Sequence, residues 1–305
     1  MRIQTCVIFC SKKFVLTSNP TFKATKSYKN RVHADRLRKR ICIFAHNQQN
    51  PTTMQILLAC AKIMNNATTV SVPCVSSPRF EADANRFALE LGQWSIDELA
   101  GALHCSHSLA QENHLRYGRF LDETEKLPAI LAYYGQAFKY LRASEFSDAD
   151  FQYAQDHLFI CSFLYGLLRP LDLIHPYRLE GNVRLQATDG EPMFTYWRSR
   201  ITDVLIDAVK ADDGVLVHLA TGEMEQLFEW GRVCREVTVV QPLFYADEGH
   251  RLKMVAVHAK SCRGAMAREI LLNRYSSPSS LLAFEQNGYR YRENYGDSLH
   301  PHFIK

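Results

Sequence analysis

The chain has 305 residues, of which 47% are hydrophobic and 22% are charged, so its composition is that of a globular protein. No apolar run approaches the roughly 20 residues that a membrane-spanning helix needs, and we expect no membrane partner. The net charge is +4, but residues 54–305 carry 31 acidic side chains against 25 lysines and arginines. A mildly acidic body argues against strong, indiscriminate binding to phosphate backbones.

Residues 1–53 form a basic extension with 11 lysines and arginines and a single acid, Asp35. A basic, acid-poor composition with many serines and threonines resembles a transit peptide. The run Arg36-Leu37-Arg38-Lys39-Arg40 also suits nucleic-acid contact or a nuclear signal. We favour a third interpretation, that translation begins at Met54 and that the upstream stretch is a mis-assigned start. For the sequence as given, we predict a disordered extension over 1–53 and one domain over 54–305.

The first part of this domain predicts a buried strand followed by helices. Met54–Cys60 is a short apolar run that suits a buried strand. A helix is predicted over Asp83–Leu91, and another after Ser95, where Ser95 and Glu98 have the spacing of a capping box. A further helix is expected over Leu109–Phe120.

In the middle of the chain, predicted strands alternate with predicted helices. Ala129–Tyr134 predicts a second buried strand. A capped helix should start at Ser147, and apolar positions at helical spacing extend it to Cys161, next to the turn that follows. Pro192 suits the start of the next helix, and Val215–Ala220 predicts a third strand.

The last part predicts two strands and a mixture of short elements. Val237–Val240, with an extension to Tyr245 left open, and Leu252–His258 resemble a strand pair joined by the Asp247-Glu248-Gly249 turn. The elements expected after it are a helix over about Gly264–Arg274, a short helix over Ser279–Phe284 and an edge strand over Tyr289–Tyr291. Strands alternating with helices indicate a mixed α/β (α+β) fold, with one mixed sheet and flanking helices in a single compact domain.

The segment Leu164–Glu180 is the most informative stretch of the sequence. It places charged residues around a corner formed by Tyr165, Gly166, Pro170 and Asp172, through which no helix can run unbroken because of its prolines. Two interpretations stay open. The fixed arginines either bind something anionic or form internal pairs with the carboxylates of a structural corner.

Several cations are predicted at the ends of elements, where open α/β sheets commonly bind ligands. Lys260 and Arg263 are expected between a strand and a helix, with Gly264 allowing close approach of the backbone and the helix N-terminus favouring an anion. The complete set of predicted anion-binding or nucleic-acid-binding residues is Lys62, Arg169, Arg178, Lys260, Arg263 and Arg268.

Glu180, Glu223 and Asp172 are candidate general acids or bases if they line the same cleft; alternatively, they neutralise the arginines. Cys60 is either a thiol activated by Lys62 or a small buried hydrophobic residue. The sequence contains no P-loop, dinucleotide fingerprint, nucleophile elbow or metal-ligand spacing, so no cofactor and no metal are predicted.

Several separated motifs resemble the peroxide-stress protein YaaA family. The corner from Leu164 to Glu180 closely matches the most distinctive segment of that family, and the resemblance extends from Met54 to about Tyr291. Further matching segments are Tyr134-Gly135, Phe146-Ser147, His218-Leu219-Ala220-Thr221 with Glu223, and Ala259-Lys260 with Arg263-Gly264 and Met266. The chain departs from the family pattern at Cys60 and Met224, where a proline and an aromatic residue are usual.

The resemblance implies a cytoplasmic protein that protects cells from hydrogen peroxide by limiting iron-dependent damage. It also implies a positively charged cleft, DNA binding and a helix-hairpin-helix-like element, for which a helix ending near Tyr165 and the turn over Gly166–Pro170 are the candidate. We therefore expect sequence-independent binding of duplex or bubble DNA through the six cations. The alternative is an enzyme that acts on a small anionic or nucleotide-like substrate in the same cleft, with Glu180 or Glu223 as acid or base. The sequence does not decide whether the protein is an enzyme.

Overall fold

The computed structural model describes residues 53–305, which contain a mixed sheet with helices packed around it. The strand order in this sheet is β4-β3-β1-β6-β7. β1 lies in the middle and runs parallel to both of its neighbours, whereas β4 runs antiparallel to β3. The five strands are β1 (Gln55–Leu58), β3 (Leu158–Ser162), β4 (Gly166–Leu168), β6 (Val215–Leu219) and β7 (Thr238–Val240).

All four residues of β1 are buried, as expected for a central strand of a largely parallel sheet that is covered on both faces. The chain after β1 first builds β3 on one side of it and later builds β6 on the other side. The sheet therefore has a topological switch point next to β1, the place where open α/β sheets form a crevice at the carboxyl ends of their strands.

The helices vary widely in length, and α7 and α9 are the longest. Both contact β6 of the sheet, and α9 also packs closely along α5. The α-helices are α1 (Glu81–Leu91), α2 (Ile96–Ala102), α3 (His107–Gly118), α4 (Ala129–Ala132), α5 (Gln136–Leu141), α6 (Asp148–His157), α7 (Met193–Ala211), α8 (Trp230–Glu236) and α9 (Ala256–Asn273). The 3-10 helices are η1 (Glu123–Glu125), η2 (Ala143–Glu145), η3 (Gln186–Thr188), η4 (Gly222–Leu227) and η5 (Pro278–Ala283).

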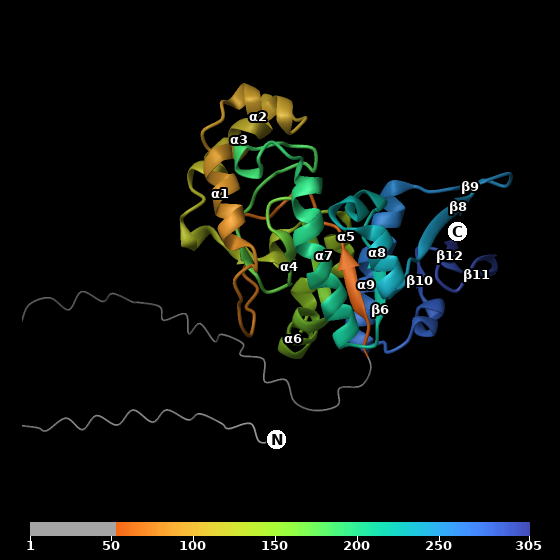
Figure 1. The fold of residues 1–305 in the computed structure, drawn as a ribbon. Coiled ribbons are helices and arrows are strands. Elements are labelled where there is room, and N and C mark those ends of the chain that lie inside the picture. The colour runs from red at the N-terminus through yellow and green to blue at the C-terminus, as the bar shows by residue number, and fades with distance from the viewer. Residues whose placement is uncertain (1–52) are drawn as a thin grey trace, which may run out of the picture. The chain divides into compact units, whose positions relative to one another are not determined.

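A second sheet has the strand order β10-β11-β12-β8-β9. Its strands are β8 (Leu243–Asp247), β9 (Leu252–Lys253), β10 (Glu285–Gln286), β11 (Tyr289–Gly296) and β12 (Pro301–Ile304). A small ladder joins β2 (Leu127–Pro128) to β5 (Leu173–Ile174). In Figure 1, α1, α2 and α3 gather at one end of the described residues and the second sheet at the other, with β1 and β6 between them.

The predicted mixed α/β class is confirmed, and so are the elements with the clearest local signals. The first strand, the helices α1 and α3 and the strand β6 lie within a few residues of their predicted bounds. The capping box is also present, because the Ser95 side chain accepts from the Glu98 N–H while the Glu98 carboxylate accepts from the Ser95 N–H. The extension predicted over residues 1–53 lies outside the described residues, apart from Thr53. Among residues 53–305, no helix combines the length and apolar character that a membrane crossing requires.

The strand predicted over Ala129–Tyr134 is wrong, because the structure has the short helix α4 there. All four residues of α4 are buried, so the hydrophobic pattern is continuous and has no period that distinguishes helix from strand. Tyr133, just after the helix, makes only an isolated bridge with Met64.

The helix expected to end near Tyr165 ends at His157 instead. Residues 158–162 form the buried strand β3, which turns back into the antiparallel strand β4 with Ser162 opposite Gly166. The candidate for the helix-hairpin-helix-like element is therefore a β-hairpin. The spacing of the apolar residues Leu158 and Cys161 fits one face of a helix. In a fully buried strand, however, every side chain is apolar or small, so this spacing does not distinguish a helix from a strand.

The third correction concerns α9, which begins at Ala256 rather than near Gly264. The strand predicted over Leu252–His258 is correspondingly short, since β9 ends at Lys253 and pairs with β8 rather than β7. Lys260, Arg263 and Gly264 therefore lie inside a helix, and the expectation of a helix N-terminus at Gly264 is wrong.

Candidate functional site

A pocket of about 340 Å³ lies at the carboxyl ends of β1 and β6. Its walls come from the segments that follow these two strands, from the start of α5 and from the first half of α9. The stretch Tyr177–Glu180 forms a further wall. The pocket thus occupies the crevice that the switch point next to β1 creates.

Three charged side chains form a connected group on one side of the pocket. Lys62 Nζ donates to both carboxylate oxygens of Glu180 at 2.8 Å, and Arg178 Nη2 lies 3.2 Å from Glu180 Oε1. The side chains of Glu180 and Arg178 are only 12% and 14% exposed, whereas that of Lys62 is 62% exposed. Glu180 is thus an anchored carboxylate between two cations, and the buried Arg178 Nε still has no hydrogen-bond partner among the described residues.

Lys260 and Arg263 line the pocket from α9, and neither side chain makes a hydrogen bond or an ion pair with any residue in 53–305. Lys260 is exposed, but Arg263 is only 7% exposed. Burial lowers the pKa of the Arg263 guanidinium, and its Nε atom has no partner within the described structure. Arginine is almost never buried without a partner, so the state of Arg263 in this pocket is unusual.

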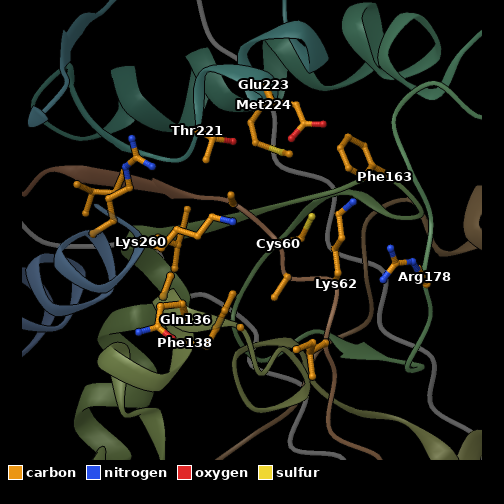
Figure 2. Close-up of a pocket in the computed structure, with 18 of the residues that line it drawn as sticks. Cys60, Lys62, Gln136, Phe138, Phe163, Arg178, Thr221, Glu223, Met224 and Lys260 are labelled. Atoms are coloured by element: carbon orange, nitrogen blue, oxygen red, sulfur yellow. The ribbon is translucent and has the colours of Figure 1, made fainter. Parts of the chain in front are cut away.

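Cys60 lies in the middle of the pocket, between Lys62 and Lys260 (Figure 2). Burial, and then the nearby carboxylates Glu223 and Glu180, raise the pKa of the Cys60 thiol to about 12. Lys62 lowers this pKa, but its effect is smaller. Of the two interpretations left open for Cys60, the structure supports the protonated, half-buried one.

Glu223 lies at the start of η4 and lines the pocket together with Thr221 and Met224. Its exposed carboxylate makes no hydrogen bond or ion pair with the residues that the structure describes. Glu180 and Glu223 therefore line the same pocket, as expected for the acids, but only Glu180 neutralises cations.

Beneath these charged groups is a buried chain of hydroxyl groups. Tyr177 Oη lies 2.8 Å from Tyr133 Oη and 2.6 Å from Ser162 Oγ, which in turn accepts from the N–H of Tyr165 at 2.9 Å. Burial raises the pKa of both tyrosines well above the ordinary value, so both stay neutral hydrogen-bonding groups. This chain of hydroxyl groups holds Tyr177 in the pocket wall and connects it to the hairpin of β3 and β4.

Arg169 lies at the opposite end of the sheet. Its Nη1 donates to Gln55 Oε1 and to the carbonyl oxygen of Asp156, both at 3.0 Å, and its guanidinium carbon lies 3.4 Å from the centre of the Phe159 ring. Burial lowers its pKa to about 10. Arg169 follows β4, and because β4 is antiparallel its end points toward the amino ends of β1 and β3.

Arg268 is also outside the pocket. Its guanidinium donates to the carbonyl oxygens of Leu141 and Arg142 and pairs with Glu145 at 2.8 Å. These bonds satisfy the carboxyl end of α5 and fasten it to α9. Of the six predicted cations, the structure brings four to one pocket and gives Arg169 and Arg268 other partners.

The predicted corner is a packed turn. Gly166 has φ +73°, and a Cβ atom there would press against the Trp197 ring. Tyr165 Oη accepts from the N–H of His175 at 3.1 Å, and the Pro170 carbonyl accepts from Ile130 at 3.0 Å.

Asp172 closes this corner. It accepts from the Arg169 N–H at 2.8 Å and from Ser76 Oγ at 2.7 Å, and burial raises its pKa to about 6. Asp172 therefore does not reach the pocket with Glu180 and Glu223.

Sequence reasoning missed the apolar part of the pocket and the polar residues Gln136 and Thr221. Phe138 and Phe163 line it, and the buried hydroxyl of Thr221 has no partner among the described residues. Only the position of Thr221, directly after a predicted strand, carried a signal. The structure also shows no group of three or more histidine, cysteine or acidic side chains within 53–305 that could hold a metal ion.

Fold and pocket together define a mixed α/β protein with a pocket at the switch point of its sheet. The model of the family described as "Peroxide stress protein YaaA" matches residues 54–295, and the chain belongs to this family. A "UPF0246 protein" of Bacteroides thetaiotaomicron is 44% identical over 252 residues, which cover 82% of this chain and 98% of that protein. Proteins with the same name from Phocaeicola vulgatus and Porphyromonas gingivalis are 41% and 38% identical, over 82% of this chain and 98% and 99% of their own lengths.

Proposed function

We propose that this member of the peroxide stress family acts by binding a small anionic molecule in the pocket between β1, β6 and α9. The observation that carries the proposal is the state of Arg263. This cation is only 7% exposed and lines the pocket without a counter-charge among the described residues. Burying an unpaired charge is costly, and a bound anion would remove that cost.

The charge balance of the pocket points the same way. Four basic side chains and two acidic ones line it, which leaves two positive charges uncompensated. Its volume of about 340 Å³ lies near the lower end of the range of small-molecule sites, about 300–1,000 Å³. The pocket also supplies Glu180 and Glu223 as groups that could move a proton, which keeps an enzymatic reaction on the bound anion within the proposal.

Binding of duplex or bubble DNA is the second candidate function. It is favoured by the exposure of Lys62 and Lys260, which lie at the same pocket and could approach phosphate groups. The geometry favours it less than a small anion, because a duplex carries a charge about every 1.7 Å and needs a row of accessible cations. Arg169 and Arg268 are already bound elsewhere.

The test measures binding by the full-length chain. Calorimetry with a panel of phosphates and mono- and dicarboxylates is compared with fluorescence anisotropy on duplex and bubble DNA across a salt series. We expect at least one small anion to bind wild type and to lose at least about tenfold affinity, or about 1.4 kcal/mol, in Arg263→Met.

The matched control is Arg292→Met, which removes one exposed arginine on β11 and should leave that affinity unchanged. If no small anion binds while DNA binds with a steep salt dependence, the second candidate replaces the first.

A further inference from the structure

We infer that the ligand of this pocket is a phosphate monoester whose other end carries hydroxyl or amino groups. The inference rests on the proposed function and goes further, because it assigns a chemical group to each end of the pocket.

The charges of the pocket are distributed unevenly between its two sides. In Figure 2, Lys260 and Thr221 lie on one side of Cys60, and Lys62 and Arg178 lie on the other. The cations on the second side share Glu180, whereas Lys260 and Arg263 have no acidic partner in residues 53–305. The uncompensated positive charge is therefore concentrated where α9 borders the pocket.

The α9 side also offers hydrogen-bond donors. The hydroxyl of Thr221 and the Nε of Arg263 are both buried and have no partners within the described residues. The first turn of α9 borders the pocket through Val257, and the N-cap, Val255, supplies no side-chain capping bond. Free N–H groups at the start of an 18-residue helix add favourable potential for an anion.

These features fit a phosphate monoester better than a carboxylate. A phosphate monoester carries a charge of about −1.5 to −2 at neutral pH and presents three acceptor oxygens. A carboxylate has one charge and would leave one of the two cations, Lys260 or Arg263, uncompensated.

The other side of the pocket offers no net charge for a second anionic group, because Glu180 and Glu223 balance Lys62 and Arg178. The carboxylates of Glu180 and Glu223 both face the region of Cys60, whose pKa they raise. Glu223 has no donor among the described residues, so it is free to accept from a ligand. Hydroxyl or amino groups are the complement of such an acceptor, whereas a second phosphate or carboxylate would find no net positive charge on this side. The fixed Lys62–Glu180 pair limits the length of the ligand on this side.

Two sources share this chemistry, a sugar phosphate and a nucleoside monophosphate, and separate probes distinguish them. Calorimetry on the full-length protein at pH 7.5 would compare ribose 5-phosphate and adenosine monophosphate with ribose, adenosine, inorganic phosphate and succinate. We expect at least one of the two esters to bind about tenfold or more tightly than inorganic phosphate, succinate and its own unphosphorylated form.

Two variants test the two ends separately. Lys260→Ala should weaken the ester and inorganic phosphate alike. Glu223→Gln should weaken the ester about fivefold or more and leave inorganic phosphate unchanged or slightly tighter, because only the ester reaches that carboxylate. Lys253→Ala removes an exposed lysine outside the pocket and serves as the control.

The outcomes separate the inference from the proposed function. Succinate binding as tightly as the esters, with loss in Arg263→Met, would overturn the phosphate assignment and leave the anion pocket standing. An ester that Glu223→Gln does not weaken would overturn the assignment of the second end. If none of the charged probes depends on Arg263, the proposed function itself fails.

Discussion

Gly264 of α9 lies directly against the carbonyl group of Ala137 in α5, so the two helices touch through their backbones. A Cβ atom at position 264 would overlap the Ala137 oxygen. The sequence-based expectation of close backbone approach at Gly264 was right, although the approaching group belongs to a second helix and not to a ligand. This contact sets the distance between two walls of the pocket, because both helices line it.

Gly264→Ala should therefore push α9 away from α5 and widen the pocket. We expect a loss of about 1–3 kcal/mol in the free energy of unfolding, as for other overpacked positions, measured by urea denaturation. Anion affinity should fall as well, because Lys260 and Arg263 move with the helix. Gly101→Ala is the control, since nothing lies within 4 Å of a Cβ atom there. Alanine at that helical position should stabilise by up to about 1 kcal/mol, and equal losses in the two variants would contradict the contact.

Arg263→Met should make the ligand-free protein more stable. The substitution removes a buried cation that has no partner within the described residues and keeps an unbranched apolar side chain in its place. We expect a gain of about 1–2 kcal/mol in the free energy of unfolding, or a few degrees in Tm, without added ligand.

The comparison variant for this stability measurement is Arg268→Met on the same helix. Arg268 holds two carbonyl oxygens and Glu145, so its replacement should cost about 1–2 kcal/mol. If both substitutions destabilise equally, Arg263 has a partner that supports the fold, and the argument for an anion site is lost.

Glu180→Gln should destabilise the fold because it leaves Arg178 and Lys62 without their shared carboxylate. Glu180 and Arg178 are both largely buried. Removing the charge of one partner leaves the other charge buried without compensation, which costs free energy. We expect about 1–3 kcal/mol by chemical denaturation. Glu223→Gln should stay within about 0.5 kcal/mol of wild type, since Glu223 is exposed and pairs with no described residue. A stable Glu180→Gln protein would show that the three-residue group contributes nothing to stability.

His175 should make the protein sensitive to mild acid. Burial, and then the nearby charge of Lys126, lower the pKa of this 2% exposed side chain to about 4, while an unfolded chain protonates its histidines near pH 6.5. Between these values the unfolded state binds the proton and the folded state does not. The stability present above pH 6.5 is therefore lost as the pH falls toward 4, by up to about 3 kcal/mol.

Asp172 acts in the opposite direction, because its pKa of about 6 means that the folded state takes up a proton first. The difference between wild type and His175→Phe isolates the histidine, since phenylalanine suits the ring contact with Phe120. Denaturation at pH 4.5 and 7.5 should show a smaller loss of stability in His175→Phe. An identical loss in both proteins would mean that His175 is protonated in the folded state.

Cys60 should be unreactive toward hydrogen peroxide despite its place in the pocket. With a pKa raised to about 12, almost none of the thiol is ionised at neutral pH, and the thiolate is the reactive form. Mass spectrometry should find its alkylation at least about a hundredfold slower in the folded protein than in urea, where the pKa returns to about 8.5. Sulfenic acid at Cys60 after brief exposure to peroxide would contradict the protonated state and assign this residue a sensing role.

The sequence predicted those parts of the fold whose signals are local. Capped helices such as α2 and the buried strands β1 and β6 were recognised, because caps and apolar runs of strand length act over a few neighbouring residues. Residues 129–132 and 158–162 were assigned to the wrong type, since a buried apolar run satisfies both geometries. Only tertiary packing decides between helix and strand there.

The candidate site was predicted in part for a related reason. Lys62 was found because it follows the first predicted strand, and Glu223 because it is an acid within a segment that resembles the family. In the structure both residues follow parallel strands, whose carboxyl ends meet at one edge of the sheet. Arg169 was placed wrongly because a helix was predicted up to the corner, where the structure has the antiparallel pair of β3 and β4. Strand direction depends on the turn at residues 163–165, and no local pattern in the sequence announced that reversal.

The pocket wall draws on segments that stand far apart along the chain, from Leu58 to Arg263. A molecule held between Lys62 and Arg263 would act as a reversible cross-link between the first strand and one of the last helices. Occupancy would then raise the unfolding temperature in proportion to the logarithm of ligand concentration above its Kd. The resistance of the protein to heat or proteolysis would thereby report how much of that molecule the surrounding solution contains.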